Sequence, residues 1–176
     1  MVFHKMPLGG AYVIGLDRIE DERGFFARSW CVKEFQEHGL NPNFVQCNVS
    51  LSKKKRTLRG MHYQVSPHEE AKFVRCTKGA IYDVIIDLRP ASATYKQWIG
   101  IELTAENRKA LYSPEGFAHG FQTLEDDTEV LYAVTESYHP ESEKGVRFND
   151  PAFGIEWPLP NPILSLKDSR HKEFVS

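Results

Sequence analysis

The sequence predicts an all-β protein built as a β-sandwich or jelly-roll barrel. Short segments with strand character recur along the chain, and turns such as Thr77-Lys78-Gly79 separate them. A single segment has a convincing helical pattern, and no long repeat, low-complexity stretch or interdomain linker interrupts the 176 residues. Many short strands with few helices favour this architecture, and the length fits one domain spanning residues 1–176.

The expected elements follow one another at short intervals. A helix is expected over residues 32–38, where Val32 and Phe35 share one face and Gly39 follows as a C-terminal stop. From residue 140 onward, proline and turn residues predominate. The expected strands cover residues 11–19, 25–30, 44–51, 57–64, 71–76, 80–88, 97–103, 109–112, 118–124 and 129–138.

Composition narrows the class of protein. With 41% hydrophobic and 26% charged residues, the chain is ordinary for a soluble globular protein. A net charge of -2 gives no bulk reason to expect a nucleic-acid partner. Cys31, Cys47 and Cys76 lack metal-like spacing and favour reduced thiols in the cytoplasm. We find no signal-like or bilayer-spanning apolar run, so no membrane association is expected.

Polar residues interrupt the strand at 57–64, which carries Arg59 and His62 where a core strand would be apolar. A second stretch, residues 114–121, carries His119 in a similar setting. We expect both to line one polar pocket inside the barrel. Strict alternation would place Arg59 and His62 on opposite faces. If they serve one ligand, Gly60 is the natural site of a bulge that re-aims the backbone.

Lys72 and two tyrosines are further candidates from strand parity. Lys72 shares its expected face with apolar neighbours, and a buried lysine needs a carboxylate or must lose its proton. Asp83 is the expected partner if residues 71–76 and 80–88 form a hairpin. Tyr132 and Tyr138 share a face about 20 Å apart at roughly 3.4 Å per residue. They therefore contact two ends of one long ligand or serve two pockets.

Each candidate also has a purely structural explanation. A lone strand histidine such as His62 is more often structural than catalytic, and His119 can belong to a turn. Tyr132 can be a core aromatic, and Asp168 a surface turn residue. The basic run at 52–56 is either a solvated turn or a device that steers an anionic ligand. The functional interpretation depends on the joint occurrence of these residues.

These residues and their neighbours resemble the dTDP-4-dehydrorhamnose 3,5-epimerase family, whose members are cupin jelly rolls. The resemblance covers residues 15–168, and several motifs in the same order make it specific. It implies a cupin-type jelly-roll β-barrel with a few short peripheral helices. The matching motifs are DERGFF (21–26), FVQCN (44–48), LRGMHYQ (58–64), KFVRC (72–76), PEGFAHGF (114–121), ND (149–150) and GIEW (154–157).

The resemblance implies a metal-independent epimerase without a cofactor. A base removes a proton next to the ketone of a nucleotide-linked 4-keto-6-deoxy sugar, and an acid returns one on the opposite face. By resemblance, His62 is the base and Asp168 orients its imidazole. Tyr132 matches the proton donor, Lys72 the group that stabilises the enolate, and His119 a sugar-binding position.

The resemblance also assigns a nucleotide-diphosphate end to the pocket. Arginine suits this task because its planar fork can bond two oxygens at once. Members of the family are homodimers in which an N-terminal segment adds to the partner's sheet, so some ligand contacts are expected from the other subunit. The positions that match ligand contacts are Arg23, Arg59, Lys167, Gln46, Asn48, Tyr138 and Glu143.

One position departs from the family pattern. The family often has glutamate where this chain has Arg28, two residues beyond the phenylalanine pair. The reversed charge at a ligand-binding position leaves the base unaffected but puts the nucleotide or the sugar in question. A relative acting at C3 only or C5 only, or a 3,4-ketoisomerase on another sugar nucleotide, stays open.

Two other classes remain as alternatives. A metal-dependent cupin would need two histidines one residue apart in its first motif, whereas His62 stands between Met61 and Tyr63. A non-catalytic sugar-nucleotide-binding module would explain the arginines and aromatics, but not the match of base, acid and lysine together.

Overall fold

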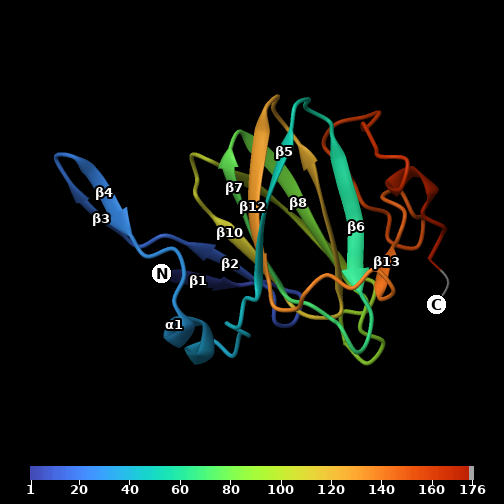
Figure 1. Cartoon of the computed structure of the whole chain (residues 1–176), viewed down its shortest axis with the longest axis horizontal. Coiled ribbons are helices and arrows are strands. Elements are labelled where there is room, and N and C mark those ends of the chain that lie inside the picture. Colours follow the sequence, from blue (N-terminus) through green and yellow to red (C-terminus); the bar gives the residue numbers. More distant parts are fainter. Residues whose placement is uncertain (175–176) are drawn as a thin grey trace.

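The computed structural model describes residues 1–174 and consists mainly of two antiparallel sheets packed face to face (Figure 1). The first sheet has the strand order β1-β2-β10-β7-β12-β5. Its strands are β1 (Val2–Lys5), β2 (Tyr12–Gly15), β10 (Ala110–Ser113), β7 (Lys72–Lys78), β12 (Thr128–Val134) and β5 (Gln46–Ser52). Apart from the β1–β2 pair, neighbours in this sheet are distant in sequence, as in a jelly roll.

The second sheet has the order β13-β6-β11-β8-β9, and it also mixes distant segments. This arrangement confirms the all-β jelly-roll prediction. Its strands are β13 (Glu143–Gly145), β6 (Leu58–Gln64), β11 (Phe117–Thr123), β8 (Ala80–Asp87) and β9 (Trp98–Thr104).

The main core lies between the two sheets and follows strand parity. On β8, Ile81 and Ile85 point inward and belong to this core with Val74 of β7 and Val130 of β12. The intervening Val84 faces the opposite side and joins a different cluster. Alternate side chains of a strand lie on opposite faces, and here both sets are buried, so both faces of β8 are covered. Each sheet therefore needs an outer cover.

Short helices and irregular segments provide these covers. The helix α1 (Val32–Glu37) places Phe35 against the outer face of the first sheet, close to the predicted 32–38. The C-terminal segment covers the second sheet, with Phe153 and Trp157 packed against it and the Trp157 indole donating to the Phe148 carbonyl at 2.8 Å. A short 3-10 helix, η1 (Asp168–Arg170), also lies here. These are the few peripheral helices that were expected.

Two expected strands have different bounds. The segment 11–19 divides into β2 and a separate strand, β3 (Arg18–Asp21), which pairs with β4 (Gly24–Ala27) in a hairpin that projects from the body (Figure 1). The segment 129–138 ends as a strand at Val134. The Thr135 N–H donates to the Ala71 carbonyl, but the Thr135 hydroxyl, and not its carbonyl, accepts from the Ala71 N–H. The chain then leaves the sheet. Strands β1 and β13 were not predicted from the sequence.

The expected Lys72–Asp83 pair is wrong. Strands β7 and β8 do not form a hairpin but belong to different sheets, and the chain crosses between them at Gly79, whose φ is +75°. Lys72 forms an ion pair with Glu70, which lies in the loop just before β7, and Asp83 pairs with His119. Both buried charges are thus compensated, but by other partners.

No helix within residues 1–174 has the length and apolar character needed to cross a bilayer.

Candidate active site

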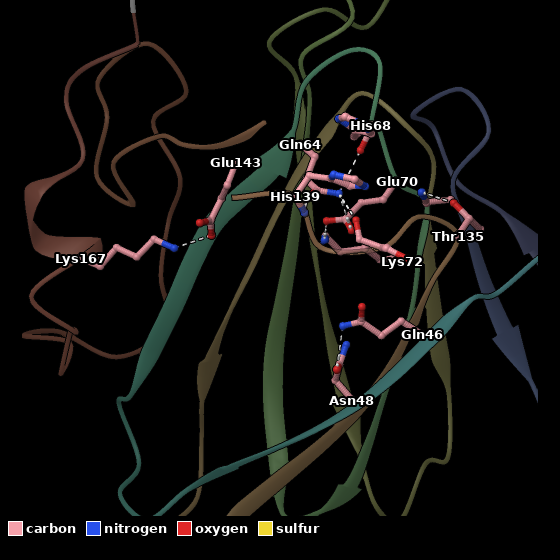
Figure 2. Close-up of polar contacts among 12 residues, drawn as sticks. Gln46, Asn48, Gln64, His68, Glu70, Lys72, Thr135, His139, Glu143 and Lys167 are labelled. Carbon is pink, nitrogen blue, oxygen red and sulfur yellow. Dashed lines mark hydrogen bonds and ion pairs between the residues drawn. The ribbon is translucent and has the colours of Figure 1, made fainter. Parts of the chain in front are cut away.

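A cleft opens between the two sheets beside β5 and β6 (Figure 2). It consists of two adjoining cavities of about 310 and 320 Å³ that share His62, Lys72, Tyr132 and Lys167. Inward-facing side chains of β5, β6, β7, β11 and β12 supply most of its walls. The predicted polar pocket inside an apolar barrel is therefore present.

A bulge at Gly60 brings Arg59 and His62 into this cleft. His62 lies opposite His119 of β11, whereas Arg59 lies opposite Phe121, so three steps along β6 match two along β11. Gly60 has a φ of +133°, and a Cβ there would lie 2.5 Å from the Gly120 Cα. Only glycine fits such a position. The predicted irregularity is confirmed, and both side chains line the same cavity.

His62 forms a close pair with Asp168 at the wall of the cleft. Its Nε2 lies 2.6 Å from the Asp168 Oδ1, although the two residues are 106 positions apart in sequence. Burial raises the pKa of Asp168, but the hydrogen bond and charge of His62, with smaller contributions from Ser165 and His171, together outweigh it, so the pKa lies below its ordinary value. We therefore assign the imidazole proton to Nε2, which leaves Nδ1 as the acceptor.

Lys72 and Tyr132 lie on neighbouring strands and face the same cleft. The Lys72 ammonium forms an ion pair with Glu70, and both side chains are nearly buried. Burial, followed by the nearby Glu70 charge, raises the pKa of the Tyr132 hydroxyl. Tyr132 therefore keeps its proton at neutral pH, and Lys72 places a positive charge in the cleft.

His119 forms a second histidine–aspartate pair beside the first. Its Nε2 lies 2.7 Å from the Oδ1 of Asp83, whose side chain is completely buried. His119 is part of β11 and not of a turn, so the turn explanation is wrong. Because Asp83 accepts from Nε2, the Nδ1 of His119 is left without the proton.

A series of polar contacts between Tyr138, Glu143 of β13 and Lys167 of the C-terminal segment rims one end of the cleft. Glu143 accepts a hydrogen bond from the Tyr138 hydroxyl at 2.7 Å. It also forms an ion pair with Lys167 (Figure 2). On β5, the Gln46 amide donates to the Asn48 side chain at 3.0 Å. Tyr138 and Tyr132 line the same cavity, although Tyr138 lies beyond the end of β12 and not on the same strand as expected.

Two predicted ligand residues lie outside the cleft. Arg23 is at the tip of the β3–β4 hairpin, where it pairs with Asp21 at 2.5 Å. Arg28 follows β4 and pairs with Glu34 of α1 at 2.8 Å. Neither arginine lines either cavity of its own chain. The basic run at 52–56 also lies outside, and Lys54 pairs with Asp126 as in a solvated turn.

Two residues at the cleft, Glu70 and Gln64, had no role predicted from the sequence. Glu70 compensates Lys72, and Gln64 bonds the backbone of His68, Ser137 and His139, which ties two loops at the mouth together. Strand parity with His62 was a usable signal for Gln64. Glu70 precedes the strand, so its approach to Lys72 depends on a loop conformation that no pattern encodes.

Comparisons with known proteins identify the family of the chain. The family model described as dTDP-4-dehydrorhamnose 3,5-epimerase matches residues 5–176. The dTDP-4-dehydrorhamnose 3,5-epimerase of Shigella flexneri is 46% identical over 156 residues, covering 88% of this chain and 86% of the relative. That of Methanothermobacter thermautotrophicus is 44% identical, covering 97% and 92%. The chain belongs to the dTDP-4-dehydrorhamnose 3,5-epimerase family.

Solved structures of this family superpose closely on the chain. The Elizabethkingia anophelis dTDP-4-dehydrorhamnose 3,5-epimerase has a TM-score of 0.96 and 42% identity, covering 99% of this chain and 96% of that structure. The Legionella pneumophila epimerase, in complex with dTDP-4-keto-L-rhamnose, has a TM-score of 0.91 and 38% identity, covering 98% and 92%. The chain is thus an epimerase with the cupin jelly-roll fold of the family.

Proposed function

We propose that this epimerase inverts C3 and C5 of dTDP-4-dehydro-6-deoxy-D-glucose to give dTDP-4-dehydro-L-rhamnose. The observation that carries the proposal is the convergence of His62, Lys72 and Tyr132 on one cleft. A base, a cation and a neutral hydroxyl are the groups that proton abstraction next to a ketone requires. No cofactor or metal has a role in this scheme.

His62 acts as the base through Nδ1. The C4 ketone acidifies the hydrogens on C3 and C5, and Nδ1 takes one of these protons while the electron pair moves onto the ketone oxygen. The imidazole then carries a positive charge, which the adjacent Asp168 carboxylate stabilises at 2.6 Å. Asp168 also fixes the tautomer, because it holds the other proton on Nε2.

Lys72 and Tyr132 complete each inversion. The enolate oxygen carries negative charge only after deprotonation, so the Lys72 ammonium stabilises the transition state more than the substrate. Tyr132 donates its proton to the opposite face of the same carbon, which restores the ketone with inverted configuration. Solvent then exchanges with the two side chains and resets their protons. His119 with Asp83 contacts the sugar near the reacting carbons.

The nucleotide end occupies the parts of both cavities that lie away from the reacting carbons. Arg59 and Lys167 supply positive charge for the diphosphate, and Tyr138 provides a ring for the base. Gln46, Asn48 and Glu143 offer polar groups for the remaining contacts. The assignment of dTDP rests on the relatives, since Arg28 still departs from the family pattern.

A homodimer would account for the features that this chain leaves exposed. Val45, Val49 and Leu131 expose apolar side chains on and beside the outer face of the first sheet. The β3–β4 hairpin pairs with no further strand within residues 1–174, and it exposes Ile19 and Phe26. Strand β1 already pairs with β2 of its own chain. We therefore assign the exchanged N-terminal segment to the hairpin, which would carry Arg23 to the partner's cleft.

We also propose a cytoplasmic location and a single domain for the chain. All three cysteines are free thiols, which suits the reducing cytoplasm. Both sheets also share one core, in agreement with a single domain over residues 1–176.

The decisive experiment uses dTDP-4-keto-6-deoxyglucose in D₂O. Deuterium should enter C3 and C5, and a rhamnose-forming reductase should convert the product. Both signals should vanish in His62→Ala. Substrate binding without any exchange in the wild type would instead indicate a non-catalytic binding module.

An epimerase acting at C3 alone is the second candidate. A curated dTDP-4-dehydrorhamnose 3-epimerase of Streptomyces niveus is 38% identical, covering 92% of this chain and 79% of the relative. The same D₂O experiment separates the two: deuterium at C3 only, with no product for the reductase, would favour the 3-epimerase.

A further inference from the structure

A third group, His171, lies against the His62–Asp168 pair and has no role in the proposed reaction. Its Nε2 is buried, lacks a hydrogen-bond partner among residues 1–174, and lies 3.6 Å from the Asp168 Oδ1. Its ring packs so closely on Gly145 that a Cβ there would fall within 2.6 Å of three ring atoms. A buried nitrogen without a partner is costly, so this position calls for a ligand.

The three side chains converge as metal ligands do. One ligand atom from each of His62, Asp168 and His171 lies within 4.8 Å of the others. Tetrahedral zinc with bonds of about 2.0–2.1 Å separates its ligand atoms by roughly 3.4 Å. The distances of 2.6 and 3.6 Å from Asp168 to the two Nε2 atoms bracket that value. Small side-chain shifts therefore suffice to enclose an ion.

The ring geometry distinguishes this cluster from a second one at the mouth of the cleft. The rings of His62 and His171 meet edge to face at 69°, so their in-plane lone pairs can point to a common atom. In the other cluster, the rings of His68 and His139 stack in parallel at 3.5 Å and 10°. Their lone pairs lie in separate parallel planes, which is unsuitable for sharing one ion.

We propose that His62, Asp168 and His171 bind a divalent transition metal of the Zn²⁺ type, and that the bound ion inhibits the epimerase. Two imidazoles and one carboxylate suit Zn²⁺ and its neighbours, whereas Mg²⁺ and Ca²⁺ prefer all-oxygen sites. The inhibitory part rests on the proposed function, in which His62 is the base.

Inhibition follows from the tautomer of His62. The ion takes the place of the proton on Nε2, and the imidazole takes up a proton from solvent on Nδ1 in exchange, so its net proton count does not change. A neutral imidazole bound to metal through Nε2 carries its remaining proton on Nδ1. Nδ1 is then a donor and cannot accept the sugar's proton. The metal thus blocks the base without occupying the sugar site.

The test uses untagged protein, with Zn²⁺ binding followed by calorimetry and Co²⁺ binding by its visible absorption. We expect one tight site per chain, chelator-reversible loss of turnover, and an affinity at least about tenfold weaker in His171→Phe. His171→Gln provides a second variant if the phenylalanine does not fit beside Gly145. His68→Gln, in the stacked cluster, is the matched control and should keep wild-type affinity.

The outcomes separate the metal site from the proposed function. Equal affinity in the wild type and both His171 variants, or loss of binding in His68→Gln, would overturn the site. Tight binding lost in His171→Phe but without inhibition would overturn the inhibitory part. If His62→Ala retains turnover, the base assignment fails, yet calorimetry on His171→Phe still decides whether the site exists.

Discussion

His62 and His119 face each other across strands β6 and β11, and each places its Nε2 against an aspartate oxygen, at 2.6 and 2.7 Å. The two pairs differ in access to the cleft. The His62 side chain is 32% exposed, whereas that of His119 is 10% exposed and its aspartate is completely buried. The same chemical pair therefore occurs once where it can exchange protons with a ligand and once in a more enclosed position.

His62→Ala should lower turnover by about 10²–10⁴-fold, because a general base contributes that much to a proton transfer. The dissociation constant for dTDP should change little, since the base acts in the chemical step. Stopped assays of C3 and C5 deuterium exchange and calorimetry with dTDP measure the two quantities. Near-normal exchange in the variant would exclude His62 as the base.

Tyr132→Phe should uncouple proton removal from inversion. The variant retains the ring and loses the hydroxyl, whose pKa burial raises, so the enolate forms but loses its proton donor. We expect deuterium exchange to persist while reductase-coupled product formation falls by about 10²-fold or more. Equal loss of exchange and product would indicate that Tyr132 organises the site and does not donate the proton.

Gly60→Ala should destabilise the protein more than Gly24→Ala. Both glycines have similar positive φ values, +133° and +128°, and a side chain in such a conformation costs about 1–3 kcal/mol. Only at Gly60 would the new Cβ also meet backbone, 2.5 Å from the Gly120 Cα; at Gly24 nothing lies within 4 Å.

Overpacking of this kind adds about 1–3 kcal/mol to the loss at Gly60. Urea denaturation of the two variants measures the difference in free energy of unfolding. Equal losses would mean that the bulge can relax around a side chain.

Strand parity allowed much of the cleft to be predicted. The alternation that placed Arg59 and His62 on opposite faces required a bulge, and Gly60 was the residue able to form it. Lys72 was expected on an inward face by the same argument. These inferences succeed because the pleat of a strand is a local property of the sequence.

The charge partners could not be predicted in this way. Asp83 follows Lys72 at hairpin distance in sequence, yet the chain changes sheets at Gly79 and places Asp83 against His119. Asp168 reaches His62 from 106 residues away, and only the family resemblance indicated that contact. Pairings that depend on sheet order and on a long irregular C-terminal segment have no local signal.

Asp87 should contribute stability that is lost in acid. Burial raises its pKa, but hydrogen bonds from Arg89, Ser92 and Thr94 outweigh this and hold the pKa well below its ordinary value. A carboxylate with a depressed folded pKa stabilises the fold above the unfolded value of about 3.9, and the contribution disappears as the pH falls through the folded pKa.

Asp87→Asn should therefore cost about 2–3 kcal/mol at pH 7, with the gap to wild type narrowing below about pH 4. Urea denaturation from pH 7 to pH 3 measures this gap. Asp126→Asn, at an exposed ion pair, is the control and should have a much smaller effect. A gap that is independent of pH would contradict the assignment.

Arg23 should act on the cleft of the partner subunit. In its own chain it lies in the turn of the β3–β4 hairpin, with 84% of its side chain exposed, and it lines neither cavity. The hairpin itself projects from the body of the molecule (Figure 1). We expect Arg23→Ala to raise KM with little effect on kcat, since a diphosphate contact is made equally in ground and transition states.

Co-expression of Arg23→Ala with His62→Ala gives hybrid dimers in which one cleft receives an intact His62 from one chain and an intact Arg23 from the other. Low-KM turnover should therefore reappear in the hybrids, although neither parent has it. Dimers of each parent, purified separately and mixed only at assay, are the control. If the hybrids remain at high KM, Arg23 does not reach across the dimer, and the hairpin has another use.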